Sequence, residues 1–321
     1  MQLQHVGTNT FDVVKDDIHQ QNLIDLLVAD KRSTQTKRAY RNDIKMFFIE
    51  MFPGVSEGVA METFLNLTQY EAIVIGLRYK EQMQNRLTSA SINRRLSALR
   101  SLVSLARKLG RCSFHLVDIK NEKVKSYRDT SGLTVDQFKL VLFAVQQQDD
   151  EILKIRDNAI LRLLWSNALR RFEIAALNVK DFDSLGKRIK VLGKGQDTPE
   201  WLEVPTGTVA AIQAYLNLRG LLPLDTPLFV AHDFKNQGHR LTGDMYSKLV
   251  KKYCERSGIT KRVSAHTLRH SSITAALDLT DGNIRKVQKM SRHKDPRTMM
   301  IYDDNRHRHQ GEVADLLDLA I

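Results

Sequence analysis

Residues 264–274 read SAHTLRHSSIT and place two histidines and one arginine within five positions. His266 and His270 are four residues apart, so they would share one face of a helix. That is the spacing of a metal-binding histidine pair. His266 and Arg269 are three residues apart, and this spacing suits two cationic donors that bind one phosphate. The stretch therefore predicts a helix that carries either a metal site or a phosphate-binding site.

The composition favours a nucleic-acid partner. The chain has 321 residues, enough for two domains, and 49 Lys and Arg against 37 Asp and Glu leave a net charge of +12. A basic excess of this size points first to polyanions, above all nucleic acid. Cys112 and Cys254 are far apart and form no zinc-binding spacing, so we predict a reducing cytoplasm. We see no signal peptide and no run of about 18 apolar residues, so we expect no membrane partner.

The N-terminal part has the periodicity of helices with basic faces. One helix is predicted after Ser33-Thr34, a second over about 68–86 and a third over 89–110, which Gly110 ends. In the first helix the apolar residues at helical spacing are Tyr40, Ile44, Phe47 and Phe48. In the third they are Ile92, Leu96, Leu99, Val103 and Ala106. These patterns predict a small helical domain.

A polar, lysine-rich segment follows, FHLVDIKNEKVKSYRDTSG at 114–132. It lacks helical periodicity and ends at Ser131-Gly132, so it reads as an interdomain linker. Its basic residues are compatible with a path along a polyanion or with plain solvation. We predict domains at 1–118 and 133–321, a linker at 119–132, and a flexible segment at 1–20.

The second domain is predicted to be mostly helical with a small sheet. Thr134 and Gln137 form a capping box at the start of one helix. Strands at 187–192 and 201–204 flank the loop GKGQDTPE and form a hairpin. Further helices are predicted at about 153–167, 208–219, 243–257, 266–278 and 282–291, after Asp295-Pro296, and at 311–321. The predicted fold class is therefore mainly α with a small β-sheet, an N-terminal helical domain followed by an α+β domain.

Four residues outside the opening stretch also suggest chemistry. Arg170 follows a strongly apolar helix and needs a partner or a ligand, which Glu173 three residues on could help to orient. Lys194 stands between two glycines at the tip of the hairpin. His293 and Tyr302 lie in MSRHKDPRTMMIYDD. A tyrosine phenol has a pKa near 10, so it is a poor nucleophile unless its proton is removed and its target activated.

These motifs together resemble the tyrosine recombinase (phage integrase) family. ALRRFEI, GKG, HTLRH and RH…IY occur in the family's order, Tyr302 stands nine positions after His293 as in the family, and STQTKRAYRNDIKMFF and SINRRLSALRSL resemble its core-binding domain. The resemblance covers the chain from about residue 20 onward, in a compact Xer-like layout. Ala168 and Arg292 stand where the family often has glycine, the loop after Lys194 lacks a second basic residue, and Asp303 and Asp304 follow the tyrosine.

The resemblance implies a SAM-like core-binding domain and a recombinase catalytic domain. It implies a site-specific recombinase that cleaves and rejoins DNA through a covalent 3′-phosphotyrosine, in integration, excision or resolution, without metal, ATP or another cofactor. The catalytic set that it implies is Arg170, Lys194, His266, Arg269, His293 and Tyr302.

The resemblance also implies a role for each residue of that set, and we expect the following assignments. Tyr302 is the nucleophile, and Arg170 and Arg269 neutralise the charge of the five-coordinate phosphate. His266 is the base or a phosphate contact. Lys194 is the general acid for the leaving 5′-oxygen.

Two histidines remain. His293 hydrogen-bonds a phosphate oxygen or orients the tyrosine, and His270 is interpreted as a packing or hydrogen-bonding support. The rival metallohydrolase interpretation of His266 and His270 is disfavoured, because Thr267 stands where the catalytic glutamate would follow and no third ligand is evident.

The implied partners are double-stranded DNA and further copies of the chain. The two domains would close around a duplex, with a tetramer of paired dimers on DNA and accessory DNA-bending proteins as candidate partners. The C-terminal helix would dock on a neighbouring copy or pack in its own domain. A type IB topoisomerase-like enzyme and a catalytically decayed DNA-binding protein are the alternatives. The candidate phosphate contacts of the first domain are Lys37, Arg38, Arg41, Arg94, Arg95 and Arg100.

Overall fold

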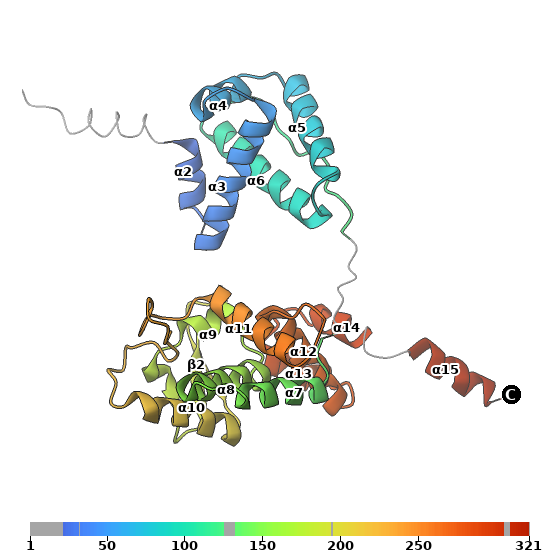
Figure 1. Ribbon diagram of the computed structural model, residues 1–321. Coiled ribbons are helices and arrows are strands. Elements are labelled where there is room, and N and C mark those ends of the chain that lie inside the picture. The colour runs from blue at the N-terminus through green and yellow to red at the C-terminus, as the bar shows by residue number, and fades with distance from the viewer. Residues whose placement is uncertain (1–21, 32, 125–131, 194, 305–308, 321) are drawn as a thin grey trace, which may run out of the picture. The chain divides into compact units, whose positions relative to one another are not determined.

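The computed structural model describes residues 22–31, 33–124, 132–193, 195–304 and 309–320, with the side chains of 301, 303, 304 and 309–313 left undescribed. The chain divides into two compact units, Met1–Ser126 and Tyr127–Ile321 (Figure 1). Both are helical, and the second contains a three-stranded sheet, which confirms the predicted fold class. In the described part of the chain, no helix has the length and apolar character that crossing a bilayer requires. The predicted flexible segment at 1–20 lies outside the described residues.

The first unit is built from helices whose starts are capped by hydroxyl side chains. Ser33 caps α3 by accepting from the Thr36 N–H, and Thr68 forms a capping box with Glu71 at α5. The predictions for α3, α5 and α6 are confirmed, whereas the two short helices α2 and α4 were not predicted. The described helices of this unit are α2 Leu23–Ala29, α3 Thr34–Met51, α4 Glu57–Leu65, α5 Gln69–Gln84 and α6 Ser89–Lys108.

An aromatic cluster forms the centre of the first unit. The Phe47 ring lies 4.9 Å from Phe64 and 5.0 Å from Tyr79, centroid to centroid, and Phe64 lies 5.3 Å from Phe114 in edge-on contacts. Ile119 is buried in the same core. The first part of the expected linker therefore packs against this unit, and residues 125–131 lie outside the described part of the chain.

The second unit begins with the predicted capping box. The Thr134 hydroxyl accepts a hydrogen bond from the Gln137 N–H, and the Gln137 side chain accepts one from the Thr134 N–H. The β2–β3 hairpin is confirmed, and a two-residue strand, β1, extends the sheet in the antiparallel order β1-β2-β3. Its elements are α7 Val135–Gln146, α8 Glu151–Ser166, α9 Arg171–Ala176, the 3₁₀ helix η1 Val179–Asp181, β1 Phe182–Asp183, β2 Arg188–Val191, β3 Glu200–Glu203, α10 Thr206–Arg219, α11 Gly243–Arg256, α12 Ala265–Leu279, α13 Ile284–Ser291, α14 Arg297–Asp304 and α15 His309–Asp318.

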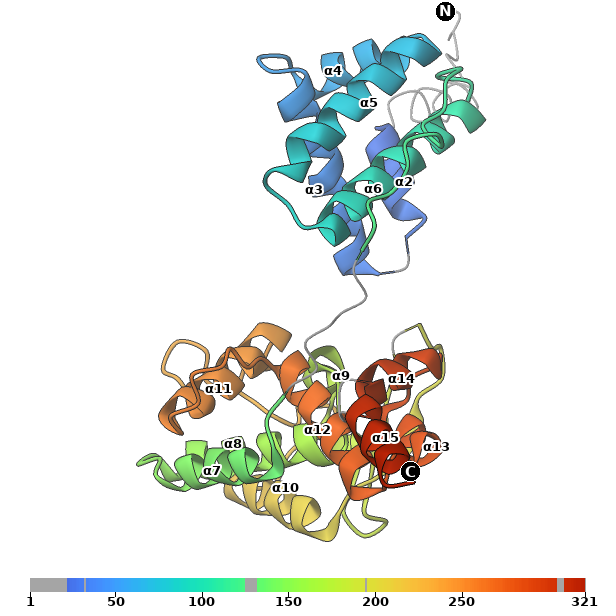
Figure 2. The same ribbon diagram turned by 90° about the vertical axis from the view of Figure 1, so that its right-hand side faces the viewer.

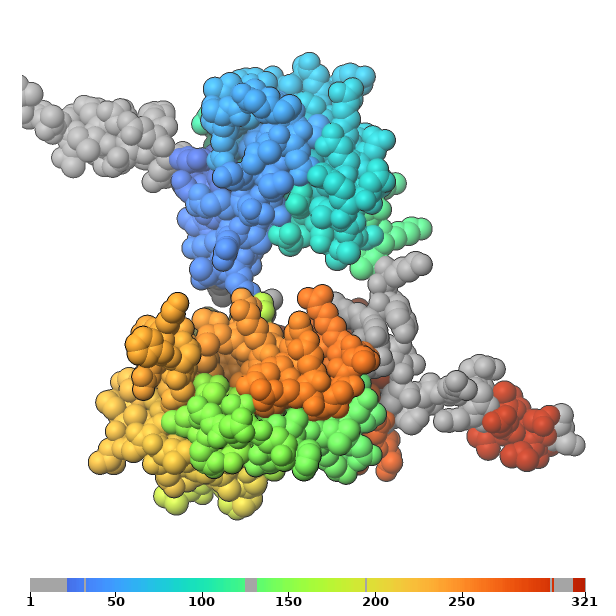
Figure 3. Space-filling view, in the orientation of Figure 1, coloured from blue at the N-terminus to red at the C-terminus, as the bar shows by residue number. Residues whose placement is uncertain are grey.

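Helix α12 is central to the second unit. In Figure 2 it lies between α7 and α8 on one side and α13 and α14 on the other. The face in Figure 3 has the green surface of α7 and α8 beside the orange surface of α11 and α12. A separate buried cluster of Ala168, Ile273, Leu277, Val287 and Met299 joins α12 to α13 and α14, and Tyr302 belongs to it. This cluster holds the chemistry-bearing side chains close to one another.

Candidate active site

The fold brings the described residues of the predicted catalytic set to neighbouring elements. Arg170 precedes α9, His266 and Arg269 lie on α12, His293 follows α13, and Tyr302 lies on α14. These residues are positioned by helices whose starts and ends meet around the buried cluster of α12, α13 and α14. The sixth residue of the predicted set, the hairpin lysine at position 194, lies outside the described residues.

Arg269 is buried, with 2% of its surface exposed, and its guanidinium is held by two backbone carbonyls. Nη1 donates to the oxygen of Ala168 and Nη2 to the oxygen of Ser291, while Nη2 lies 3.4 Å from His293 Nε2. Burial and the nearby Arg170 lower the pKa of Arg269 to about 9, which still leaves it cationic at neutral pH. The site therefore contains a fixed, desolvated positive charge.

One buried carboxylate organises two further arginines. Glu173 Oε1 accepts from Arg170 Nη1 at 2.9 Å, and Glu173 Oε2 accepts from Arg292 Nη2 at 2.8 Å. The Glu173 side chain is fully buried, so both ion pairs lie where solvent screens them little. The predicted Arg170–Glu173 contact is confirmed, whereas Arg292 was not foreseen as the second partner.

Two left-handed backbone positions lie where the chain departs from the glycines of the family that it resembles. Ala168 has φ of 44° and Arg292 has φ of 57°. Glycine adopts such angles without steric cost, whereas other residues do so at a cost of about 1–2 kcal/mol. At both positions this chain keeps the conformation without the glycine, and at Arg292 the Glu173 ion pair offsets part of that cost.

The backbone at Arg292 gives a stability prediction. Both Arg292→Ala and Arg292→Gly remove the ion pair, but only glycine relieves the left-handed conformation. We expect the free energy of unfolding of the glycine variant to exceed that of the alanine variant by about 1 kcal/mol, as measured by denaturant unfolding. At Lys139, exposed in the right-handed helix α7, the order should reverse. An alanine variant at Arg292 as stable as the glycine variant would contradict the strained backbone.

His293 is held as a neutral side chain. Its Nδ1 lies 3.0 Å from the Ser291 hydroxyl, and its Nε2 faces Arg269. Burial, followed by the positive charges of Arg269 and Arg170, lowers the pKa of His293 to about 3. At neutral pH, His293 therefore stays uncharged and makes hydrogen bonds, but it does not take up a proton.

Tyr302 is buried, at 3% exposure, and its phenol oxygen is hydrogen-bonded to Nδ1 of His270. His270 Nε2 in turn lies 2.8 Å from His266 Nε2, and the two imidazole rings are edge-on with centroids 4.2 Å apart. His266 is exposed at the outer end of this series. The pair that resembled a metal site is thus a hydrogen-bonded chain that leads to the tyrosine.

Three residues around the site were missed or undervalued by sequence reasoning. Ser291 positions both Arg269 and His293, Arg292 completes the Glu173 pair, and His270 contacts the tyrosine. The glycine departure could have indicated Arg292. The four-residue spacing of the histidines could have indicated His270, but a helical spacing does not say which neighbouring element a ring meets. Nothing in the sequence pattern distinguishes Ser291.

The basic candidates of the first unit differ in their surroundings. Arg38 and Arg41 are exposed and line a surface hollow of about 610 Å³ together with Lys45. Arg94 pairs with the buried Asp43 at 2.5 Å. Arg95 is only 14% exposed and bonds Tyr79 at 3.2 Å and Glu50 at 3.4 Å. The other two candidates are Lys37, which is half-buried, and Arg100, which donates to Asn121.

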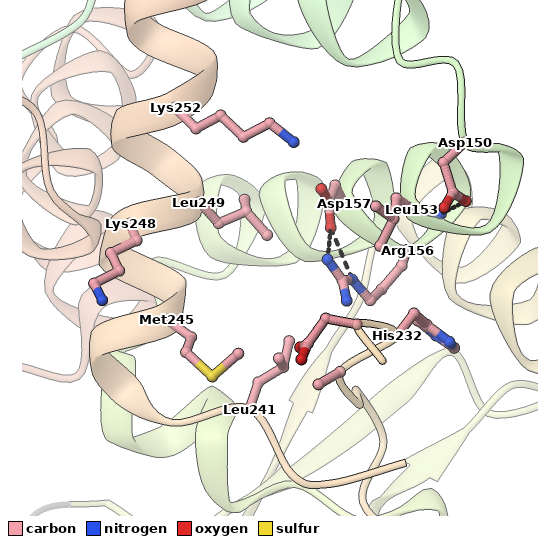
Figure 4. Close-up of a pocket in the computed structure, with 12 residues that line it drawn as sticks. Asp150, Leu153, Arg156, Asp157, His232, Leu241, Met245, Lys248, Leu249 and Lys252 are labelled. Carbon is pink, nitrogen blue, oxygen red and sulfur yellow. Dashed lines mark hydrogen bonds and ion pairs between the residues drawn. The ribbon is translucent and has the colours of Figure 1, made fainter. Parts of the chain in front are cut away.

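A cavity of about 550 Å³ lies between α8 and α11 (Figure 4), and none of the predicted catalytic residues lines it. Its buried charges have partners. Arg156 Nε donates to Asp157 at 2.8 Å, Asp157 accepts from the Tyr253 hydroxyl at 2.7 Å, and His232 Nε2 lies 2.9 Å from the Tyr215 hydroxyl. These pairs explain the polar lining as structural support for the fold. Among the described residues there is no group of three His, Cys, Asp or Glu placed to hold a metal ion.

Comparison with known proteins identifies the class. Residues 132–309 match the model of the phage integrase family, and residues 20–110 match the phage integrase N-terminal SAM-like domain. Since the first match spans more than half of the chain, the protein belongs to the phage integrase family. It is a site-specific tyrosine recombinase, and the topoisomerase-like and inactive alternatives are not favoured.

Similar individual proteins belong to the same class. The chain is 41% identical to the tyrosine recombinase slr0733 of Synechocystis sp. over 298 residues, 92% of this chain and 95% of the relative. It is 43% identical to the tyrosine recombinase Synpcc7942_B2651 of Synechococcus elongatus, with 92% of each chain covered. The fold resembles that of the XerH site-specific recombinase bound to a palindromic difH substrate after cleavage, with a TM-score of 0.68, 18% identity, and 97% of this chain and 90% of that chain covered.

Proposed function

We propose that Tyr302 attacks a phosphodiester of double-stranded DNA and forms a covalent 3′-phosphotyrosine, which a second strand then resolves. The observation that carries this proposal is the buried Tyr302 hydroxyl, bonded to His270 beside a cluster of desolvated arginines. A tyrosine in that setting has both a group that can take its proton and a positive field for its target.

The arginines would supply the stabilisation that the reaction needs. A phosphodiester repels nucleophiles because it is anionic, and its five-coordinate transition state carries still more negative charge. Arg269 is fixed before DNA arrives, so its charge is preorganised. Arg170 retains 24% side-chain exposure while Glu173 holds it, so its guanidinium can turn donors toward a phosphate.

The remaining steps need a proton for the leaving group and no external energy source. Lys194, on the hairpin loop, is our candidate acid for the 5′-oxygen. The bond energy stays in the protein–DNA ester, so we expect neither ATP nor a metal. A reducing cytoplasm, where Cys112 and Cys254 would stay as the free thiols described here, is the compartment we propose.

The first unit would add phosphate contacts that fall off steeply with salt. Its geometry favours Arg38, which is exposed beside a hollow, over Arg41, which pairs with Asp25, and over Arg95, whose charge Glu50 and Asp43 already balance. Contacts to bases, which set the target sequence, are not assigned by charge alone.

Selection of covalent adducts from a DNA library tests this function and identifies the target sequence in the same step. We would use a duplex library with randomised arms around a central 5′-bridging phosphorothiolate, in the presence of EDTA. Attack on this linkage releases a thiol that rejoins poorly, so the protein is trapped on cleaved DNA. We expect sequenced adducts to converge on one site. Failure of the wild-type protein to form any adduct would contradict the function, and adducts lost in EDTA would revive a metal-dependent reaction.

The C-terminal helix is our candidate for contact between copies on DNA. The described side chains of α15 are exposed, with Leu316 and Leu317 at 66%, and Leu319 just after the helix is 83% exposed. An apolar helix face left in water is unfavourable and suits docking on a second copy. We propose a tetramer of two paired dimers on two sites, with accessory DNA-bending proteins as candidate partners.

Deletion of residues 311–321 tests this role. We expect the truncated protein to bind a single selected site and to form the adduct, but to lose assembly on paired sites in gel-shift and light-scattering measurements. A second variant replaces Leu316 and Leu317 by serine within the full-length chain, and we expect it to lose assembly in the same way. Normal assembly of both variants on paired sites would rule out docking through α15.

A further inference from the structure

We propose that His270 relays the Tyr302 proton to His266, so that the base for DNA cleavage is a two-histidine chain rather than His266 alone. The inference rests on the proposed function, because it concerns the same attack by the same tyrosine. It assigns a catalytic role to a residue that sequence reasoning treated as a support.

The geometry runs in one direction from the buried nucleophile to the surface. The Tyr302 hydroxyl is bonded to His270 Nδ1, and the opposite nitrogen of the same ring, Nε2, lies 2.8 Å from His266 Nε2. The His270 ring is tilted by 30° against the phenol, with centroids 5.1 Å apart. His270 is half-buried and His266 is exposed. An imidazole that bonds a donor at one nitrogen and an acceptor at the other is the arrangement that a proton shuttle requires.

The protons and bonds balance without any further reactant. As the Tyr302 oxygen bonds to phosphorus, its O–H bond breaks and the proton goes to Nδ1 of His270. The proton already on Nε2 of His270 passes to Nε2 of His266. His270 ends neutral with its tautomer reversed, His266 ends as an imidazolium, and the bond from phosphorus to the 5′-oxygen breaks as that oxygen takes a proton from Lys194.

The surroundings explain why the proton would move outward. On the inner side, the His293 ring lies 6.1 Å from the Tyr302 ring, centroid to centroid, and burial together with the arginine charges opposes protonation of His293. His266 is at the solvent-exposed end, where a new positive charge is hydrated. There the imidazolium would also attract a phosphate. The same proton transfer would therefore make His266 both the final base and a phosphate contact, the two roles that the sequence left open for it.

The test compares His270→Asn with the wild type. Asparagine keeps an acceptor near the position of Nδ1 but cannot take up a proton, so it separates hydrogen bonding from proton transfer. We expect single-turnover cleavage of the selected duplex, nicked to trap the adduct, to slow by about 10²–10³-fold, within the usual range for general-base catalysis. The matched control is His239→Asn, an exposed histidine elsewhere in the second unit, which should cleave like the wild type.

Two substitutions of the reactants separate a proton relay from structural support. A difluorinated tyrosine at position 302 ionises more readily, so it should recover most of the His270→Asn defect while changing the wild-type rate much less. A 5′-bridging sulfur leaves without a proton, so it should rescue Lys194→Ala but not His270→Asn. If the folded His270→Asn protein cleaves within a fewfold of the wild type, or if sulfur rescues it, the relay is wrong.

Other results would overturn either the relay or the proposed function. Equal effects of the fluorinated tyrosine in wild type and variant would mark His270 as structural and would overturn the relay. Should His270→Asn unfold, His270→Gln with the same two rescues replaces it. Loss of adduct in the wild-type protein, or an adduct that survives Tyr302→Phe, would instead overturn the proposed function, independently of any His270 result.

Discussion

Tyr302→Phe should abolish the covalent protein–DNA adduct and leave DNA binding intact. The change removes the nucleophilic oxygen but keeps the ring that packs in the small cluster of α12, α13 and α14. The expected cost to stability includes the hydrogen bond to His270, about 1 kcal/mol. We would measure adduct formation by denaturing electrophoresis and affinity by gel shift on the same selected duplex.

The control for this prediction is a tyrosine of the same unit that we place outside the chemistry. Tyr215 is buried against Phe229 and bonds His232, so Tyr215→Phe should lower stability and keep the adduct. If Tyr302→Phe formed an adduct at an appreciable fraction of the wild-type rate, a different nucleophile would be at work.

The second large effect is expected at Arg269. Removing one preorganised donor from a developing oxyanion typically costs about 10²–10³-fold in rate, and Arg269→Ala also removes a buried charge, so we expect at least that loss of cleavage. Binding of the duplex should change far less, because many phosphate contacts share it.

Stability has to be separated from chemistry at this position. Arg269→Ala leaves the carbonyls of Ala168 and Ser291 without their buried donor, at a cost of about 1–3 kcal/mol for each. Arg269→Lys keeps the charge but not the two-pronged geometry, so it should fold better than alanine and still cleave poorly. A well-folded lysine variant with near wild-type cleavage would show that charge alone is enough and that the fixed guanidinium is not needed.

Much of the fold could be predicted because the local signals agreed with one another. Thr134 with Gln137, the hairpin around GKG and the apolar stripe of the third helix all appeared as expected. The helices that were not predicted include α2, α4 and α9, which span only 7, 9 and 6 residues, so their periodicity is too brief to recognise. The aromatic centre also extends to Phe114 and Ile119, beyond the last predicted helix, because burial there depends on tertiary contacts that no short pattern encodes.

The sequence motifs proposed the members of the site but not how their side chains connect. The order of motifs indicated Arg170, Arg269, His293 and Tyr302, which the fold indeed brings together. It could not show that one carboxylate, Glu173, serves two arginines, since Arg292 is 119 residues away in the chain. Likewise, the meeting of His270 with Tyr302 depends on how α14 crosses α12.

The most direct measurement of the central claim is the chemical identity of the trapped linkage. The adduct on the selected duplex would be digested with protease and nuclease and analysed by mass spectrometry. We predict a single peptide that contains Tyr302, esterified through its phenol oxygen to a 3′-phosphate, with a free 5′ end on the other strand fragment. Attachment at any other residue, or linkage to a 5′-phosphate, would contradict the account.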